Sequence, residues 1–319
     1  MASTRHYVRP DVGAFLQSRL GQPDLSELSV EAARASYAQL VASADMEAQT
    51  LALVRDLACP GPGGEIGLRL FDRRATRDPG PALLFFHGGG FVVGSIDVYH
   101  NFCTHIAAEL DLPVMSVDYR LAPEHPFPAA PDDCEAAARW IASNPQEVER
   151  TVTALIIMGE SAGGNLTIVT TQALMAAPAA VPVHLQVPIY PAADNVITHE
   201  SYHLFNEGYL SDKQTMAWYG RAYAAELNHP RVFPCLGQHG GMPPTVLVTA
   251  GLDPLRDSGR AYAADLVRAG SELVYLEMAG MIHGFCPFRK ALPSAQRDMD
   301  VIFGAVRLML ARGLGSGFH

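Results

Sequence analysis

The stretch that decides the fold of this chain is Ala154-Leu155-Ile156-Ile157-Met158-Gly159-Glu160-Ser161-Ala162-Gly163. Its apolar start predicts a buried strand, and residues 165–175 predict a helix. Between them, the G-x-S-x-G pentapeptide would form a sharp strand-to-helix turn, because glycine tolerates backbone angles that other residues avoid. This order predicts Ser161 as a nucleophile at the tip of the turn. The alternative is a plain turn in which Ser161 only caps the helix.

The composition narrows the classes of partner. The chain has 319 residues, of which 49% are hydrophobic and 18% charged, and its formal net charge is -10. This acidic balance disfavours nucleic acids and anionic membrane surfaces as partners. Residues 161–183 carry no charge and are long enough to span a bilayer, but Pro178 and Pro182 favour a buried helix instead. The segment 72–78 mixes both signs of charge and predicts a solvated loop.

The cysteines and histidines indicate neither a disulfide framework nor a metal site. The five cysteines are scattered and have no C-x-x-C spacing. His100 and His105 lie in a predicted helix at a spacing that does not place them on one face. The N-terminal region carries Arg9 and Asp11 and lacks the pattern of a secretory signal. We therefore expect a cytoplasmic protein without a metal or cofactor.

Short, continuous apolar runs recur from residue 81 onward, separated by helix-like stretches. Strands that are buried on both faces and alternate with helices predict an α/β fold, with a mostly parallel central sheet and helices on both faces. Ahead of them, the segments 51–57 and 66–71 predict an antiparallel hairpin at one edge of the sheet. The predicted buried strands are 82–86, 112–117, 154–158, 185–189, 245–249 and 273–276.

Two segments do not follow this alternation. Residues 1–48 predict helices only, and residues 191–242 contain helix-like pieces but no buried strand. An insertion of this length after a strand is typical of a lid over an active site. We expect a core of residues 49–190 and 243–319, with the other two segments forming one helical cap.

A glycine-rich turn follows the predicted strand 82–86, with the sequence His87-Gly88-Gly89-Gly90-Phe91. Successive glycines leave backbone N–H groups unobstructed, which suits a site that stabilises an oxyanion. We expect Gly88, Gly89 and Ala162 to supply these donors. The alternative is a glycine-rich turn with no catalytic role.

A serine nucleophile needs a base and a carboxylate that orients the base. His283 follows the last predicted strand, where this chain order places the base. Asp253 follows the strand 245–249 and is the expected acid, whereas its rival Asp257 suits the N-terminus of the next helix. The remaining downstream histidines lie at a strand start or in or near the predicted cap: His184, His199, His203, His229 and His239.

With these motifs, the chain resembles the hormone-sensitive-lipase-like family of α/β hydrolases, the family IV bacterial esterases. The resemblance covers residues 81–290 and rests on the two glycine motifs and on Tyr119-Arg120-Leu121-Ala122-Pro123-Glu124-His125-Pro126-Phe127-Pro128-Ala129-Ala130. It implies an α/β-hydrolase fold, a triad of Ser161, Asp253 and His283, and a helical cap. Glu160 replaces the family's more usual aspartate. Its side chain should point away from the serine hydroxyl and alter local hydrogen bonding more than the chemistry.

The expected function is that of a serine carboxylesterase acting on small-molecule esters, and the resemblance implies short to medium acyl chains. Two alternatives stay open: an amidase or peptidase with the same triad, and a non-catalytic binding protein on this fold. Plant gibberellin receptors exemplify the second by resemblance, but they lack the triad histidine. A homodimer is compatible with the sequence. The candidate substrate-binding residues, which could line a pocket or pack within the cap, are Phe91, Tyr190, Phe205, Tyr209 and Trp218.

Overall fold

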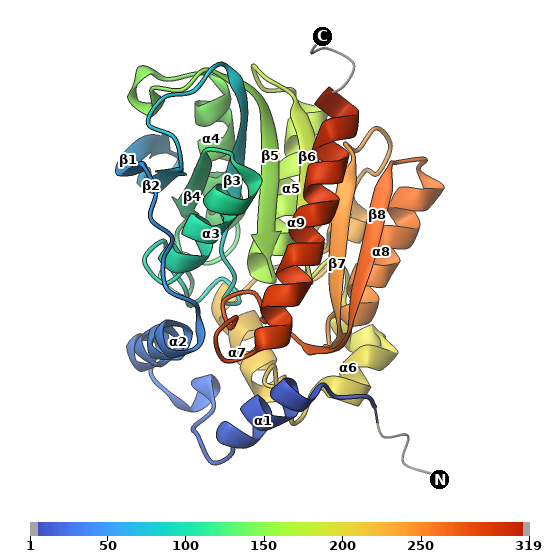
Figure 1. Cartoon of the computed structure of the whole chain (residues 1–319). Helices are drawn as coiled ribbons and strands as arrows, with labels where there is room; N and C mark the ends of the chain where they lie inside the picture. Colours follow the sequence, from blue (N-terminus) through green and yellow to red (C-terminus); the bar gives the residue numbers. More distant parts are fainter. Residues whose placement is uncertain (1–5, 315–319) are drawn as a thin grey trace.

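A twisted sheet runs through the centre of the protein, and helices cover both of its faces (Figure 1). The structure is a computed structural model and describes residues 6–314. The strands are β1 (Leu53–Gly61), β2 (Gly64–Asp72), β3 (Gly80–Phe86), β4 (Val114–Asp118), β5 (Val152–Glu160), β6 (Val183–Ile189), β7 (Thr245–Leu252) and β8 (Leu273–Ile282). They lie in the order β1-β2-β4-β3-β5-β6-β7-β8. The pairs β1–β2 and β2–β4 are antiparallel, and the remaining neighbours are parallel.

The helices fall into two groups. α3 (His100–Leu110) and α9 (Pro293–Leu314) cover one face of the sheet, and α4 (Ala129–Ala142), α5 (Ala162–Ala176) and α8 (Arg256–Arg268) cover the other (Figure 1). At the carboxyl ends of the parallel strands lie α1 (Pro10–Ser18), α2 (Val30–Ala44), α6 (Glu200–Phe205) and α7 (Lys213–Tyr223). Short 3-10 turns complete the chain: η1 (Leu25–Glu27), η2 (Gln146–Val148), η3 (Val196–Thr198) and η4 (Pro234–Leu236).

The predicted α/β fold with a mostly parallel sheet is confirmed, and so is the antiparallel hairpin at its edge. The strand β5 shows why its sequence is apolar without a break. Ile156 and Met158 pack into the hydrophobic core on one face of the sheet. Leu155 and Ile157 pack into the core on the other. Because helices cover both faces, each residue of a central strand must be apolar.

The uncharged stretch 161–183 forms α5 and then leads into β6, as the buried-helix prediction requires. Most of α5 is buried against β5, β6 and α4. Among residues 6–314, no helix is both long and apolar enough to cross a membrane.

We call α1, η1, α2, α6 and α7 together the cap, because they lie side by side over the carboxyl edge of the sheet (Figure 1). The two parts of the cap are far apart in the sequence but in direct contact. The Thr215 hydroxyl of α7 donates a hydrogen bond of 2.6 Å to the Asp24 carboxylate, which precedes η1. Residues before β1 and residues after β6 therefore meet in one layer.

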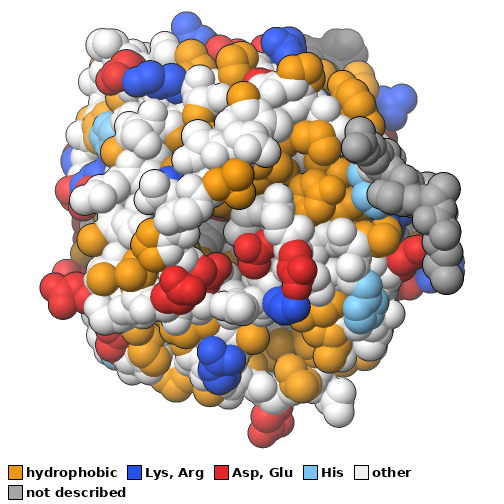
Figure 2. All heavy atoms as spheres, turned by 90° about the horizontal axis from the view of Figure 1, so that it is seen from below, with side chains coloured by type: hydrophobic (Ala, Val, Ile, Leu, Met, Phe, Trp, Pro, Cys, Tyr) orange, Lys and Arg blue, Asp and Glu red, His pale blue; other side chains and the backbone are white. Residues whose placement is uncertain are grey.

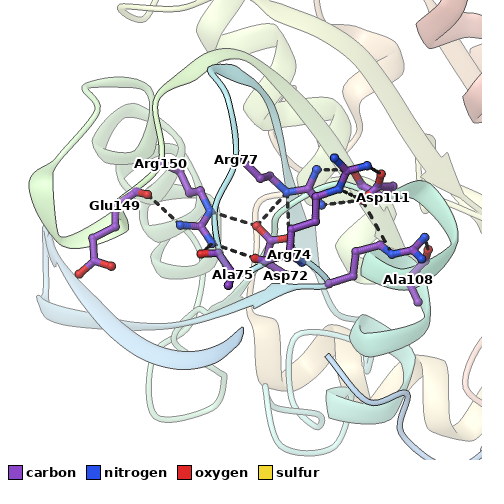
Figure 3. Close-up of polar contacts among 9 residues, drawn as sticks. Asp72, Arg74, Ala75, Arg77, Ala108, Asp111, Glu149 and Arg150 are labelled. Carbon is purple, nitrogen blue, oxygen red and sulfur yellow. Dashed lines mark hydrogen bonds and ion pairs between the residues drawn. The ribbon is translucent and has the colours of Figure 1, made fainter. Parts of the chain in front are cut away.

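The segment 72–78 is exposed at residues 73–76 and 78, as the predicted solvated loop requires, but Asp72 and Arg77 depart from that prediction. The Asp72 side chain is completely buried and accepts hydrogen bonds from Arg77 Nε at 2.8 Å and from Arg150 Nε at 3.0 Å. Arg77 also bonds the Asp111 carboxylate at 2.8 Å, and Arg150 reaches the carbonyl oxygens of residues 74 and 75 (Figure 3). The buried Asp72 carboxylate thus ties the β2–β3 connection to Arg77 within the segment and to Arg150 just before β5.

Replacing Asp72 with alanine is expected to destabilise the protein by about 3–5 kcal/mol, because the largely buried Arg150 would lose the Asp72 carboxylate and Arg77 would keep only Asp111. The side chains of Arg77 and Arg150 are only 13% and 6% exposed. The measurement is the shift of the urea unfolding curve monitored by circular dichroism. Glu149→Gln is the control, since its side chain is 65% exposed and should contribute less than about 1 kcal/mol. Equal effects of the two variants would contradict a buried network.

Candidate active site

Ser161 lies at the turn between β5 and α5, with φ 58° and ψ -117°. A side chain on Gly159 would overlap the Gly163 carbonyl, and one on Gly163 would overlap the Phe86 carbonyl, so both positions require glycine. The Ser161 N–H donates to the Ile189 carbonyl at 2.9 Å, which fixes this strained backbone against β6. The Ser161 hydroxyl makes no capping hydrogen bond to α5. The structure therefore does not support the alternative in which Ser161 only caps the helix.

The predicted nucleophile, base and acid lie in one hydrogen-bonded row. Ser161 Oγ is 2.7 Å from His283 Nε2, and His283 Nδ1 is 2.7 Å from Asp253 Oδ2. Ser161, Asp253 and His283 directly follow β5, β7 and β8, so strand ends at one edge of the sheet bring the three side chains together. The other Asp253 oxygen accepts the Leu255 N–H at 2.7 Å, which fixes the carboxylate.

The rival candidates lie elsewhere. The carboxylate of Asp257 pairs with Arg256 and Arg260 and accepts the Ser201 N–H. Among the alternative histidines, His199 contacts Asp194 and His239 contacts the Cys235 carbonyl. The structure thus places Asp253 and His283 beside Ser161, rather than these rivals.

The environment of His283 favours its protonated form. Burial acts to lower the pKa of His283, but the charge of Asp253, its hydrogen bond and the nearby Glu160 outweigh burial and raise this pKa above the ordinary value. A group with a raised pKa is a stronger base. His283 is therefore suited to take a proton from Ser161.

The glycine turn after β3 places only some of the predicted oxyanion donors at the site. Gly89, Gly90 and Ala162 line the cavity next to Ser161, but Gly88 is not among the residues that line it. Instead, Gly88 lies against the Glu160 carboxylate, which a side chain at this position would overlap. No hydrogen bond within residues 6–314 uses the N–H of Gly89 or Gly90.

Glu160 is 1% exposed and points to the back of this turn. Its carboxylate accepts a 2.5 Å hydrogen bond from the Tyr99 hydroxyl, which lies 2.6 Å from the Tyr37 hydroxyl of α2. Burial raises the pKa of Glu160, and hydrogen bonds from Tyr99 and the Gly88 backbone oppose this rise. The Glu160 carboxylate thus takes part in a local hydrogen-bond network, as expected.

A cavity of about 410 Å³ lies between the sheet edge and the cap, and Ser161 and His283 lie in its wall. Apolar side chains dominate its lining. The cap contributes much of the wall through Leu16, Leu20, Leu25, Tyr37, Leu40, Leu210, Met216, Tyr219 and Tyr223. Viewed from the cap side, this end of the molecule shows hydrophobic side chains interspersed with charged ones (Figure 2).

Of the predicted substrate-binding residues, only Phe91 lines this cavity. Tyr190 is 1% exposed and packs its ring against His283 at 4.8 Å, while its hydroxyl accepts the Cys286 N–H. Phe205 and Tyr209 pack edge to face within the cap. Trp218 packs against Tyr219 in a small hydrophobic cluster. These four aromatic residues therefore pack within the protein instead of facing the cavity.

The cavity residues of α7 were not predicted from the sequence, and they follow a helical spacing. Met216, Tyr219, Gly220 and Tyr223 of α7 all line the cavity. Their spacing of three and four residues places them on one face of the helix, whereas Trp218 falls off that face. This periodicity was the signal that could have identified them. Among residues 6–314, no group of three or more His, Cys, Asp and Glu is arranged to hold a metal ion.

Comparisons with known proteins agree with this fold. A family model described as "alpha/beta hydrolase fold" matches residues 83–287. The chain is 31% identical to an ethyl acetate hydrolase of Pseudomonas putida, over 94% of this chain and 98% of that protein. It is 30% identical to the carboxylesterase NlhH of Mycobacterium tuberculosis, over 90% of this chain and 92% of that protein.

Solved structures give the same result. An ester hydrolase from the metagenome of Lake Arreo, in complex with a bipyridine phosphonate derivative, superposes with a TM-score of 0.88 at 35% identity, covering 96% of this chain and 99% of that one. The esterase of Pyrobaculum calidifontis superposes with a TM-score of 0.87 at 32% identity, covering 95% and 99%. The resemblance found in the sequence motifs is confirmed: this chain belongs to the hormone-sensitive-lipase-like family of α/β hydrolases.

Proposed function

We propose that the protein is a serine carboxylesterase that hydrolyses short- to medium-chain esters of small molecules through an acyl-enzyme. The observation that carries this proposal is the unbroken row from Ser161 through His283 to Asp253, with 2.7 Å at each step, opening on an apolar cavity. The names of the relatives, which include several carboxylic ester hydrolases, support the same reaction class. A non-catalytic binding protein would not need His283 in this position.

In the first half of the reaction, His283 Nε2 accepts the hydroxyl proton as Ser161 Oγ attacks the ester carbonyl carbon. The carbonyl oxygen becomes an oxyanion, and the imidazolium formed on His283 is stabilised by Asp253. His283 then gives its proton to the leaving alcohol, and the acyl group stays on Ser161. In the second half, water gives a proton to His283 as it attacks the acyl carbon, and His283 then returns this proton to Ser161 Oγ as the acid is released.

We assign the oxyanion donors to the N–H groups of Gly89, Gly90 and Ala162. This replaces Gly88 of the sequence prediction with Gly90. The reason is position: Gly89 and Gly90 line the cavity at Ser161, whereas Gly88 faces Glu160 behind it. Hydrogen-bond donors that point at the developing negative charge stabilise the transition state. In a site of low polarity this stabilisation is often the largest contribution to catalysis.

The cysteines bear on the compartment, and the cavity volume bears on the substrate size. The described cysteines are free thiols, and all but Cys235 are buried, which supports a reducing compartment such as the cytoplasm. A cavity of about 410 Å³ with mainly apolar walls favours a small or medium acyl group.

A matched pair of substrates tests the reaction class. We expect a p-nitrophenyl ester to be hydrolysed faster than the p-nitroanilide of the same acid by about 10²–10⁴-fold, the range that proton transfer to a leaving group contributes. The measurement is kcat/KM for each compound over a series of acyl lengths. Comparable rates on the anilide would favour the amidase alternative instead.

A further inference from the structure

The loop that carries the oxyanion donors, residues 88–93, has an intrinsically unfavourable backbone conformation. Gly89, Gly90 and Phe91 all have positive φ angles, 113°, 59° and 64°. For Phe91 such a conformation costs about 1–3 kcal/mol and persists only where the surroundings impose it. The surroundings of this loop therefore decide whether the donors face Ser161.

The core fixes the beginning of the loop and also contacts Phe91. His87 stacks on Tyr119 at 4.4 Å, and the Tyr119 hydroxyl donates to the His87 carbonyl at 2.7 Å. Next to it, Gly88 lies against Glu160. The Gly89 carbonyl accepts the N–H groups of Val92 and Val93, and side chains of the cap contact the loop beyond this turn.

Arg34 of α2 holds the end of the loop through its guanidinium group. Arg34 Nε donates to the Val92 carbonyl at 2.9 Å, and one terminal nitrogen donates to the Ala122 carbonyl at 3.1 Å. Both terminal nitrogens pair with Glu124, at 2.8 and 2.7 Å. The Ala122 N–H in turn donates to the Phe91 carbonyl at 2.8 Å. One cap side chain thus bonds the loop and the segment that supports it.

Two tyrosines of α7 cover the middle of the loop. The Tyr219 ring lies flat against Gly90, where a side chain would overlap it. The Tyr223 ring stacks on Phe91 with centroids 4.0 Å apart and an angle of 7° between the planes. Val92 and Val93 are fully buried in a small cluster with Ala33 of α2, separate from the two large cores.

We propose that the cap positions the oxyanion loop, with Arg34, Tyr219 and Tyr223 as positioning residues that hold Gly89 and Gly90 facing Ser161. This rests on the proposed function, since it assigns a role to groups around that site. It gives the cap a part in catalysis beyond enclosing the substrate. A displacement of α2 or α7 would withdraw the donors, so the protein is competent for acyl transfer only while its cap is in place.

Arg34 offers the sharpest test, because it is not among the residues that line the cavity. In Arg34→Met the stem remains and the guanidinium is lost. We expect kcat to fall by about 10–100-fold, less than the full loss of a donor, with KM changed by less than about threefold. Arg139→Met is the matched control: its side chain is 35% exposed against 32% for Arg34, and it pairs with Glu135 of its own helix. The control should keep wild-type kcat.

A transition-state analogue separates positioning from general damage. Ser161 Oγ adds to a trifluoromethyl ketone, its proton passes to His283, and the ketone oxygen becomes an oxyanion held by the donors. In Arg34→Met the inhibition constant should rise by the same factor as kcat/KM falls, with an unchanged circular dichroism spectrum. Arg34→Lys, which cannot make the several guanidinium hydrogen bonds, should lose part of the activity. If the methionine variant does not fold, the same kcat and inhibition measurements on the lysine variant test the proposal.

Unchanged kcat in the Arg34 variants, or a loss of kcat with wild-type affinity for the ketone, would overturn the proposal. A wild-type protein that neither hydrolyses esters nor binds the ketone would instead overturn the proposed function.

Discussion

Ser161→Ala is expected to lower kcat for ester hydrolysis by about 10⁶-fold, the loss that removal of the nucleophile causes in other triads. The reason is that His283 would have no hydroxyl to deprotonate at 2.7 Å, and no acyl-enzyme could form. The measurement is the steady-state rate on a p-nitrophenyl ester, with mass spectrometry to detect the acyl adduct.

The fold should survive this change, because the Ser161 side chain does not cap α5 and its strained backbone is held by main-chain contacts. Ser116→Ala is a suitable control. Ser116 is a buried serine within β4, and its loss should leave kcat within a few-fold of wild type. Ser161→Ala protein that keeps a tenth of the wild-type rate would remove Ser161 from the mechanism.

The interior of each strand was predictable from the sequence, but the ends were not. The apolar run of β5 stops at Met158, whereas the strand continues to Glu160, which pairs with Ile189 of β6. Strand ends depend on hydrogen bonds to a neighbouring strand, and these are set by residues far away in the chain. Apolar periodicity reports burial along a single segment only.

The difference between features of a single segment and contacts with distant residues also explains which site residues were predicted. Ser161, Asp253 and His283 each follow a strand directly, and parallel strands end at one edge of a sheet, so chain order alone brings them together. Asp72 could not be placed in this way, because its burial depends on Arg150, which lies 78 residues later in the chain.

The sequence also could not predict which glycines of the loop and which side chains of the cap line the cavity. Which of three consecutive glycines faces the cavity depends on the turn at Gly89 and on the Glu160 side chain behind it. From α7 the prediction chose Trp218 by residue type, without regard to the helical face. The rotation of the helix places Tyr219 and Tyr223 in the cavity wall instead.

Asp253→Asn is expected to lower kcat by about 10⁴-fold, because an amide beside His283 Nδ1 no longer holds the imidazole in the tautomer that accepts the serine proton. The buried Asp253 carboxylate lies 2.7 Å from that nitrogen. The matched control is Asp257→Asn, which changes the rival carboxylate four positions along the chain. Because Asp257 is held by Arg256 and Arg260, away from His283, this variant should keep kcat within a few-fold of wild type.

The pH profile gives this pair of variants a second readout. Burial lowers the pKa of His283, and in the wild type Asp253, with a smaller contribution from Glu160, more than reverses this, so the pKa lies above the ordinary value of about 6.5. Since only neutral His283 accepts the proton, wild-type kcat/KM should fall as the pH drops through a value above 6.5. In Asp253→Asn burial acts without the opposing carboxylate, so the pKa of His283 falls and the acidic limb moves to lower pH. Asp257→Asn should leave the limb in place, and a limb that moves in that variant instead would transfer the orienting role to Asp257.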